Sequence, residues 1–426
     1  MSWLQALKRE ANFLRHQKSF VAILWIALGL STFAVCSGMV EIAKQETTIA
    51  RLIAYDEQDR QSVASKYKDY GSLAYYSFHL TYLPPSSLAF SAIGQRDVMP
   101  WKHRIRMLAL EGQIYETDAD NPELSQAGRI DFAFLISVLS PLLVILLLHD
   151  LRASERNAGR YDLLVTTAKN STQLWWSRTL ILVSSLFVAL VLPFCVGASF
   201  SGTSLGETLD VLWIVGLQIA FWTLLCFWVG RMSASAPKLA SILLGVWLLT
   251  SVLVPVMGEY DINASVRSPN GGDIVLLQRE AVNDAWDLPF KATFEPFLER
   301  HPEWKKYTEM ESLFHWKWYY AFQQVGDQKA ESVSRAYRQA TLDKNTLAAK
   351  VAWLSPAMMT QQALTRLAKT DTLSALAYEQ QIRDFHQGLR QFYYPLIFKD
   401  QEVTQEVLQQ RPDFRALYTL DRYRQK

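Results

Sequence analysis

Cysteines and catalytic motifs are what this sequence most clearly lacks. Only three of its 426 residues are cysteine, and Cys36, Cys195 and Cys226 all lie within apolar runs. The seven histidines are scattered, and no Cys/His spacing is typical of a zinc site. The polar segments must therefore fold by packing alone, without disulfide bonds.

The sequence also lacks the motifs that would indicate an enzyme. It has no Gly-x-x-x-x-Gly-Lys-Ser/Thr loop for nucleotide phosphates, no Gly-x-Ser-x-Gly nucleophile elbow and no HExxH zinc helix. The net charge of +2 gives no reason to expect nucleic acid as a partner. We expect no enzyme activity, cofactor or metal on this chain; a periplasmic enzyme tethered by membrane spans is the disfavoured alternative.

Charged residues are absent from five apolar runs. A helix of about 20 mostly apolar residues is needed to cross roughly 30 Å of hydrocarbon. The runs therefore predict an α-helical polytopic membrane protein with about five transmembrane helices, at residues 20–40, 132–148, 179–200, 211–229 and 239–257. Coupled secondary transporters usually hold an ionisable group inside the bilayer, so the uncharged runs argue against transport driven by protons or sodium.

The short loops between these runs differ in charge, which predicts their side of the membrane. Lys and Arg collect in residues 1–19, 149–178 and 230–238. The remaining short loop, 201–210, is acidic and has no basic residue. Because basic short loops stay in the cytoplasm, we predict a bacterial inner-membrane protein with a cytoplasmic N-terminus and a periplasmic C-terminus. It would have two extracytoplasmic segments, 41–131 and 258–426.

The N-terminal segment, residues 1–19, has the pattern of an interfacial helix. Apolar residues recur at helical spacing, with basic residues on the other faces: Trp3, Leu4, Leu7, Ala11 and Leu14. Such a helix lies along the inner membrane surface with its apolar stripe, including Trp3, at the lipid headgroups. Membrane lipid is therefore an expected partner, and an ordinary solvated helix is the alternative.

The two predicted extracytoplasmic segments differ in expected structure. Residues 41–69 continue the first span as a helix, 70–101 are irregular or form short strands, and 104–116 form a short helix or strand. The second segment is expected to be mostly helical, with helices at 274–286, 302–326, 328–349, 356–369 and 371–394. One buried face of the second of these helices would carry Trp304, Tyr307, Phe314, Trp318 and Phe322.

The predicted cytoplasmic loop, 149–178, is the most informative stretch of the chain. Its charged residues precede an apolar helical set: Glu155, Arg156 and Arg160, then Leu163 and Leu164. A turn of small residues follows. Trp175 and Trp176 then suit the membrane interface where the third span begins.

Two sets of residues carry a family resemblance. An acidic residue, a basic residue, a glycine and a leucine pair follow one another in the loop, at Glu155, Arg156, Gly159, Leu163 and Leu164. In this order the loop resembles the coupling loop of permease subunits of ABC-2-type exporters, although Arg160 and Tyr161 replace the usual Thr-Leu. Residues 354–357, 362–364, 367–368, 370–371 and 380–381 resemble the extracytoplasmic insert of a subfamily of these permeases that has no assigned substrate.

The resemblance implies a permease subunit that pairs with a second copy or a paralogue and is driven by an ABC ATPase dimer. ATP and Mg²⁺ would be bound by that ATPase, which would contact Glu155, Arg156, Gly159, Arg160, Leu163 and Leu164. Members of the group normally end in a sixth span, so either this subunit ends outside the membrane or the sequence is truncated. The alternative function is mechanotransmission, in which ATP hydrolysis by the partner acts on a periplasmic protein without moving solute.

Overall fold

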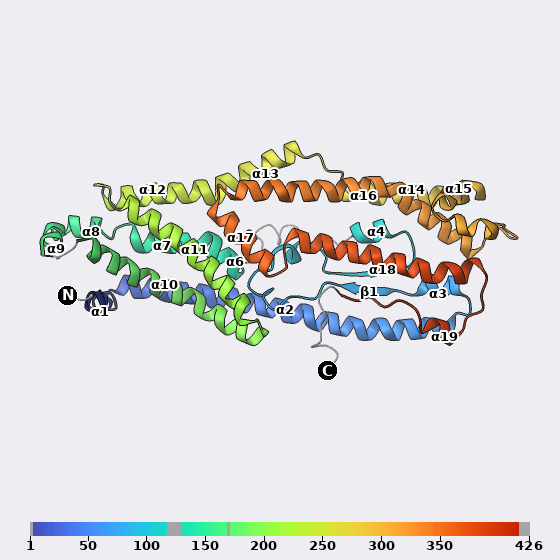
Figure 1. Ribbon diagram of the computed structural model, residues 1–426, viewed down its shortest axis with the longest axis horizontal. Coiled ribbons are helices and arrows are strands. Elements are labelled where there is room, and N and C mark those ends of the chain that lie inside the picture. The colour runs from blue at the N-terminus through green and yellow to red at the C-terminus, as the bar shows by residue number, and fades with distance from the viewer. Residues whose placement is uncertain (1–2, 117–129, 168–170, 417–426) are drawn as a thin grey trace.

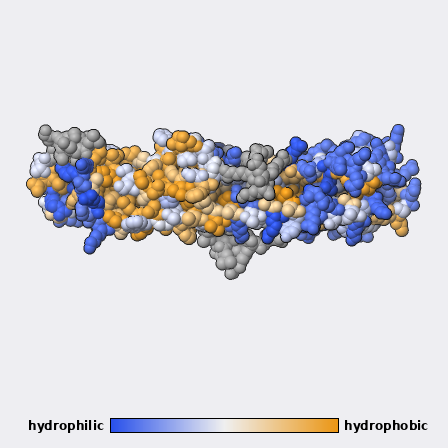
Figure 2. Space-filling view, turned by 90° about the horizontal axis from the view of Figure 1, so that it is seen from below, coloured by the Kyte–Doolittle hydropathy of each residue, from blue (hydrophilic) through white to orange (hydrophobic). Residues whose placement is uncertain are grey.

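A computed structural model describes residues 3–116, 130–167 and 171–416 of the chain. The molecule is elongated, and most of its long helices run along the long axis (Figure 1). Figure 2 shows apolar residues gathered between a small hydrophilic end and a larger hydrophilic region. We call these the apolar half, the small polar end (α1, Trp3–Leu14; α8, Ala153–Asn157; α9, Tyr161–Thr167) and the large polar half (most of 50–116 and 266–416).

Within the described residues, five helices are long and apolar enough to cross a membrane. They are α2 (Lys18–Lys66), the stretch Phe132–Asn157, α10 (Ser171–Ser201), α11 (Leu205–Val229) and the stretch Ala236–Ser265. The prediction of an α-helical protein with about five membrane-length helices is confirmed. α2 continues well past its apolar run because strong helix formers such as Ala, Gln, Glu and Arg follow. It ends close to the predicted end of the extension, residue 69.

Two spans contain a short π-helix just before a proline. These are η2 (Leu135–Leu139), between α6 (Phe132–Phe134) and α7 (Ser140–Leu148), and η3 (Leu249–Leu253), between α12 (Ala236–Leu248) and α13 (Val254–Ser265). Proline has no N–H and its ring collides with the carbonyl four residues earlier, so the wider turn accommodates Pro141 and Pro255. The carbonyl that Pro141 leaves without its helical donor belongs to Ser137, and Gln218 Nε2 of α11 donates to it at 3.1 Å.

The large polar half begins with short elements and continues with long helices. The first group is α3 (Tyr70–Tyr76), β1 (His79–Tyr82), η1 (Gly94–Asp97), β2 (Lys102–Ile105) and α4 (Leu110–Tyr115). β1 pairs antiparallel with β2, with His79 opposite Ile105. The second group is α14 (Gly271–Asp284), α15 (Phe290–Arg300), η4 (Pro302–Tyr307), α16 (Trp316–Ala352), α17 (Pro356–Leu367), α18 (Thr372–Phe398) and α19 (Gln405–Leu408).

Most of these elements match the sequence predictions, but the two helices expected at 302–326 and 328–349 are wrong. Pro302–Tyr307 forms a single 3-10 segment, and one uninterrupted helix, α16, begins at Trp316. Gly326 lies within α16 and does not end a helix. It lies against α14, where an added Cβ would be 2.8 Å from Val282. The glycine therefore permits close packing of two helices. α3 and α15 were not predicted, and Pro296 lies inside α15.

The predicted aromatic stripe is not one helical face. Trp304 lies on η4, whereas Trp318 and Phe322 lie on α16, and these three are buried. Tyr307 and Phe314 are 36% and 42% exposed. The expectation of core aromatics holds for the three buried residues, while the helix that was to align all five does not exist.

Phe90 closes the apolar half where it meets the large polar half. It lies in the irregular stretch between β1 and η1, and its ring stacks on Phe194 of α10 with centroids 5.8 Å apart. Glycines on the two neighbouring spans make room for it: a Cβ on Gly38 would lie 1.8 Å from the Phe90 carbonyl oxygen, and one on Gly197 would lie 2.8 Å from the ring. A loop from a polar segment thus seals the end of the α2–α10 pair.

Replacing Gly38 by Ala should destabilise the protein. The added methyl group collides with backbone rather than with a flexible side chain, so the Phe90 loop must move, and overpacking of this kind typically costs about 1–3 kcal/mol. A lower melting temperature of the detergent-purified protein would show it. Gly29 lies on the same helix with no described atom within 4 Å of its added Cβ, so Gly29→Ala is the matched control and should be neutral or slightly stabilising. Equal melting temperatures for the two variants would contradict the packing described for Phe90.

Candidate functional site

The predicted coupling residues lie together at the small polar end, beside the N-terminus in Figure 1. α8 and α9 form a short hairpin whose turn is Gly159. This residue has a φ of +68°, in the left-handed region that glycine adopts without strain. An added Cβ would meet no described atom within 4 Å, so glycine is required here for its backbone conformation and not for space.

Glu155 is buried at the base of this hairpin. Its carboxylate accepts from Arg178 Nη1 at 2.8 Å and from Arg160 Nε at 2.9 Å. Arg178 also donates Nε to Glu10 of α1 at 2.7 Å, and Arg9 Nη2 pairs with Glu10 at 2.9 Å. We call this alternating series of charges the ion chain: Arg9, Glu10, Arg178, Glu155 and Arg160.

The ion chain joins three parts of the protein that are distant in sequence. Glu10 belongs to α1, Glu155 to the α8–α9 hairpin and Arg178 to the beginning of the span α10. The three inner side chains are each less than a tenth exposed. Buried charges are tolerated only when opposite charges and hydrogen bonds compensate them, and each of these has an oppositely charged partner within 3 Å. The hairpin is thereby anchored both to a span and to the N-terminal helix.

Arg156 connects the hairpin to a further pair of spans. Its Nη1 donates to the carbonyl of Met232, in the loop between α11 and α12, at 2.8 Å. Its guanidinium also lies 4.8 Å from the centre of the Tyr161 ring on α9. A displacement of the hairpin would therefore act on α10 through Arg178 and on the α11–α12 loop through Arg156.

The tryptophans at the start of α10 make contacts within the protein. Trp175 is buried and stacks on Tyr161 with ring centroids 5.8 Å apart, and Trp176 stacks on Phe227 of α11 at 4.4 Å. They stand where the third span begins, as the sequence indicates, and their contact with lipid headgroups stays a prediction. Trp3 is the first residue of α1, and its side chain lies outside the described residues.

The leucine pair of the predicted coupling motif lies on the outer helix of the hairpin. Leu163 of α9 is 64% exposed and Leu164 is half-buried. Leu163 is therefore an exposed apolar side chain on a helix whose base is fixed by ion pairs. The six predicted residues are thus brought together but divide into three roles. Glu155, Arg156 and Arg160 hold the hairpin, Gly159 shapes it, and the two leucines are exposed or half-buried on α9.

Glu10 and Arg178 are the residues that sequence reasoning did not assign to this site. Glu10 follows Leu7 by three residues and precedes Leu14 by four, so it lies on the apolar stripe of α1. Leu14 is buried and α1 packs on α10, so the stripe faces protein at these positions. An acidic residue on an apolar helical face was the available signal for a buried ion pair.

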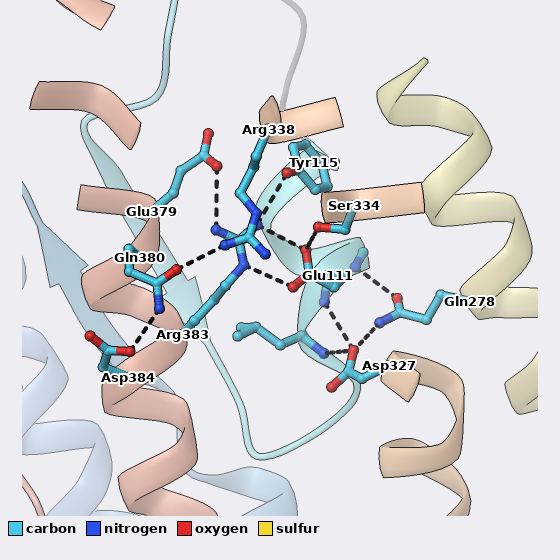
Figure 3. Close-up of polar contacts among 12 residues, drawn as sticks. Glu111, Tyr115, Gln278, Asp327, Ser334, Arg338, Glu379, Gln380, Arg383 and Asp384 are labelled. Atoms are coloured by element: carbon cyan, nitrogen blue, oxygen red, sulfur yellow. Dashed lines mark hydrogen bonds and ion pairs between the residues drawn. The ribbon is translucent and has the colours of Figure 1, made fainter. Parts of the chain in front are cut away.

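A second buried polar cluster lies in the large polar half and was also not predicted (Figure 3). Glu111 of α4 accepts from Arg383 of α18 through both carboxylate oxygens, at 2.8 and 2.9 Å, and from Ser334 of α16 at 2.7 Å. Although burial opposes it, the hydrogen bonds from Arg383 hold the pKa of Glu111 below its usual value. Burial raises the pKa of Glu379, the next carboxyl along. Glu111 thereby joins α4 to α18 through a bidentate ion pair and to α16 through a hydrogen bond.

Asp327 of α16 extends this cluster. One of its carboxylate oxygens accepts from the backbone N–H groups of Leu110 and Glu111, at 2.7 and 3.1 Å, and thereby satisfies the first turn of α4. The same oxygen accepts from Gln278 Nε2 of α14 at 2.6 Å, and the other accepts from Arg390 of α18 at 2.6 Å. Burial raises the pKa of Asp327 despite these donors.

A cleft of about 580 Å³ opens beside the cluster. Its lining includes Arg383, Arg390 and His386. Burial lowers the pKa of His386. Two of the lining arginines pair with carboxylates, Arg383 with Glu111 and Arg390 with Asp327. These ion pairs stabilise the packing of α4, α16 and α18. Within residues 3–116, 130–167 and 171–416, no group of three or more His, Cys, Asp or Glu side chains is placed to hold a metal ion.

One comparison bears on this half of the molecule. Residues 274–416, from α14 to the stretch after α19, match a family described as a domain of unknown function, DUF3526. The matched region contains Asp327, Ser334 and Arg383 of the second cluster, and it also contains α17. Comparisons with curated proteins and with solved structures gave no match.

Replacing Arg178 by Met should destabilise the protein strongly. The substitution keeps an unbranched side chain but leaves Glu10 and Glu155 without the cation that they share, and removing one member of a buried ion pair typically costs about 3–5 kcal/mol. The melting temperature in detergent measures the effect. Arg15→Met, at an exposed position just after α1, is the control and should change little.

A compensating variant separates the charge effect from loss of packing. When Glu10→Gln and Glu155→Gln are added to Arg178→Met, neutral amides replace the two buried carboxylates, and part of the lost stability should return. If Arg178→Met unfolds at the same temperature as Arg15→Met, the ion chain does not hold the hairpin.

Proposed function

We propose that this chain is the membrane-spanning permease subunit of an ATP-driven ABC-2-type export complex in a bacterial inner membrane. It would pair with a second copy or a paralogue, and an ABC ATPase dimer would bind ATP and Mg²⁺. The N-terminus and the small polar end would face the cytoplasm, and most of the large polar half would face the periplasm. On this proposal the chain itself hydrolyses nothing.

The α8–α9 hairpin is the observation that carries the proposal. A membrane protein driven by a separate ATPase needs a cytoplasmic element that the ATPase can move and that transmits this motion to the spans. The hairpin offers Leu163 at its surface, while the ion chain fastens its base to α10 and α1. Arg156 adds a connection to the α11–α12 loop. Motion of the hairpin as a lever would change the packing of these spans.

A second function, mechanotransmission to a periplasmic partner, is favoured by the length of α2. This helix has 49 residues and at 1.5 Å per residue extends roughly 74 Å, from the small polar end through the apolar half into the large polar half. A tilt of its membrane-embedded part would therefore be carried outward without an intervening hinge. In this alternative the same hairpin receives the motion, but no solute crosses the membrane.

Substitution of Leu163 by Asp should weaken the contact with the ATPase. The affinity-tagged chain would be purified from native membranes and its partners identified, and an ATPase with a nucleotide-binding loop should co-purify. Leu163→Asp places a charge on the exposed face of α9, so the amount of bound ATPase and the associated ATP hydrolysis should both fall. Leu313→Asp is the matched control, because Leu313 is 90% exposed in the large polar half. A co-purified ATPase that retains full activity with Leu163→Asp would contradict docking on α9, and so would the absence of any ATPase.

Charge reversal at Arg156 should instead affect coupling. Arg156→Glu removes the hydrogen bond to Met232 and the contact with the Tyr161 ring but leaves Leu163 and Leu164 in place, so we expect the ATPase to remain bound while transport-linked ATP hydrolysis falls. Vesicles containing the purified complex and a mixture of candidate solutes would separate the two functions. Export predicts ATP-dependent movement of solute, whereas mechanotransmission predicts ATP hydrolysis with none. Unchanged hydrolysis in Arg156→Glu would contradict a coupling role for this residue.

A further inference from the structure

α17 lies among the spans although it belongs, in sequence, to the second polar segment. It packs against α11, η2 and η3, and Leu364 and Ala368 are buried in the same apolar core as the spans. In Figure 1 the corner between α16 and α17 lies alongside α11 and α12 rather than beyond their ends. The residues in this corner are Trp353, Leu354 and Ser355.

Hydrogen bonds fix the depth of α17 relative to the spans. Thr360 Oγ1 donates to Gln218 Oε1 at 3.0 Å, and Ser137 Oγ donates to Gln361 Oε1 at 3.1 Å. Gln218 is eight residues along α11 from Asp210, where the charge-free part of that helix begins, which is roughly 12 Å at 1.5 Å per residue. Ser137 is six residues past Asp131, or roughly 9 Å. Two independent spans therefore place the same part of α17 well inside the apolar half.

The direction of α17 makes its N-terminal end the deepest part. At the other end, Ala368 accepts from Ser86 at 2.5 Å, and Thr370 donates to the Ala92 carbonyl at 2.8 Å. Ser86 and Ala92 belong to the loop that carries Phe90 and that closes the apolar half. α17 thus starts at the corner, runs past Thr360 and rises to the boundary between the halves.

The incoming helix, α16, also carries the corner past the end of the apolar run of the fifth span. It runs beside α13, the last part of the fifth span-length helix. An added Cβ on Gly258 would lie 2.6 Å from Val351 of α16, so the two helices touch just where the apolar run of that span ends. Trp353 and Leu354 come two and three residues after Val351, on the side toward the spans. α16 and α17 therefore form a helical hairpin that enters the apolar half and leaves it again.

The side chains at the tip of this hairpin are large, apolar and exposed. Trp353 is 78% exposed and Leu354 is 68% exposed. Val256 and Met257, on the neighbouring span, are 59% and 68% exposed, so the tip continues an apolar surface that a bilayer would cover. We propose that the α16–α17 corner is a re-entrant element inserted into the outer leaflet, with Trp353 and Leu354 in contact with lipid acyl chains. Tryptophan is enriched near the membrane interface. The backbone N–H groups of Trp353, Leu354 and Ser355 each donate to the carbonyl three residues earlier, so the corner leaves none of these donors unpaired.

Lipid is the occupant that this position selects. A soluble periplasmic protein would have to displace bilayer to reach a surface between the levels of Asp210 and Gln218. The proposal depends on the apolar half being embedded in a membrane, and it does not depend on ATP-driven transport. The α16–α17 corner would anchor the large polar half to the bilayer at a further place, in addition to the chain connections at α2, α6 and α13.

Quenching of a fluorescent label by spin-labelled lipid tests the proposal. In a full-length background with Cys36, Cys195 and Cys226 replaced by Ala, single cysteines at Leu354, Leu313 and Leu192 would each carry the environment-sensitive dye NBD in reconstituted phosphatidylcholine vesicles. Leu192 is 52% exposed within the span α10 and reports acyl chains, whereas Leu313 is 90% exposed in the large polar half and reports water. Phosphatidylcholine with a nitroxide on its acyl chain should quench the label at 354 as it quenches the label at 192, with a matching blue shift.

Two results would overturn the proposal. If the label at 354 is quenched by aqueous iodide but not by the lipid nitroxide, as expected for the label at 313, the corner is in water. If it is protected from both quenchers, another protein chain covers the corner instead of lipid. Elution of each labelled protein as a single folded species, and the two reference labels behaving as assigned, ensure that the result at 354 is informative. Either failure would leave the proposed coupling at α8–α9 untouched, because that proposal is tested by ATPase binding.

Discussion

The structure depends on one constraint: a backbone carbonyl that loses its helical donor inside the apolar half must find another donor within the protein. In hydrocarbon an unsatisfied backbone group costs several kcal/mol. Pro141 deprives the Ser137 carbonyl of its helical donor, and Gln218 of α11 supplies the replacement. The other end of the same Gln218 amide accepts from Thr360 of α17. A single proline therefore requires a glutamine on a neighbouring span, and that glutamine provides a docking point for a helix from the polar half.

The same constraint operates with charge at the other end of the apolar half. Arg178 lies near the beginning of a span and cannot be buried alone, so it lies between two carboxylates, Glu10 and Glu155, which precede it by 168 and 23 residues. The arrangement needs both the N-terminal helix and the α8–α9 hairpin in place. If either the N-terminal helix or the hairpin moved alone, a buried charge would lose its oppositely charged partner in a medium of low dielectric constant. A rigid connection between hairpin and span is what a lever requires, and it follows here from electrostatics.

Much of the fold could be predicted from the sequence, because membrane-length helices are determined by local composition. An uncharged run of about 20 residues forms a helix whatever lies beside it, and α2, α10 and α11 follow directly. The extension of α2 and the helicity of the second polar segment were also available from helix-forming residues. Predictions failed where the structural role of a residue depends on a contact with a residue distant in sequence. From sequence alone Gly326 indicates the end of a helix, but in the structure it permits α14 to pack against α16. Pro302 indicates the start of a helix, but in the structure it begins a 3-10 segment that carries the buried Trp304.

The candidate site likewise has features that could be predicted from local sequence and features that could not. The sequence predicted charged residues from Glu155 followed by an apolar helical set, and these residues lie on α8, on α9 and in the turn at Gly159 between them. Their role in coupling stays a prediction. The sequence could not indicate that Glu155 would be buried, because Arg178, the buried cation that compensates it, is 23 residues away. Arg178 in turn pairs with Glu10, 168 residues from it. Likewise, α17 has the composition of an ordinary amphipathic helix. Its position among the spans depends on Gln218 and Ser137, whose hydrogen-bonding needs arise only once two other helices are assembled.

These long-range contacts make the two halves of the molecule parts of one packed body. Chain connectivity alone would allow the large polar half to swing on its connections at α2, α6 and α13. The Phe90 loop fills the end of the α2–α10 pair, and α17 is hydrogen-bonded to the second and fourth spans. A change in span packing that starts at Arg178 or Arg156 therefore has to reach the polar half, because the helices that carry Ser137 and Gln218 also carry α17. Export and mechanotransmission both need such a connection, and they differ in whether the change also opens a path between the spans.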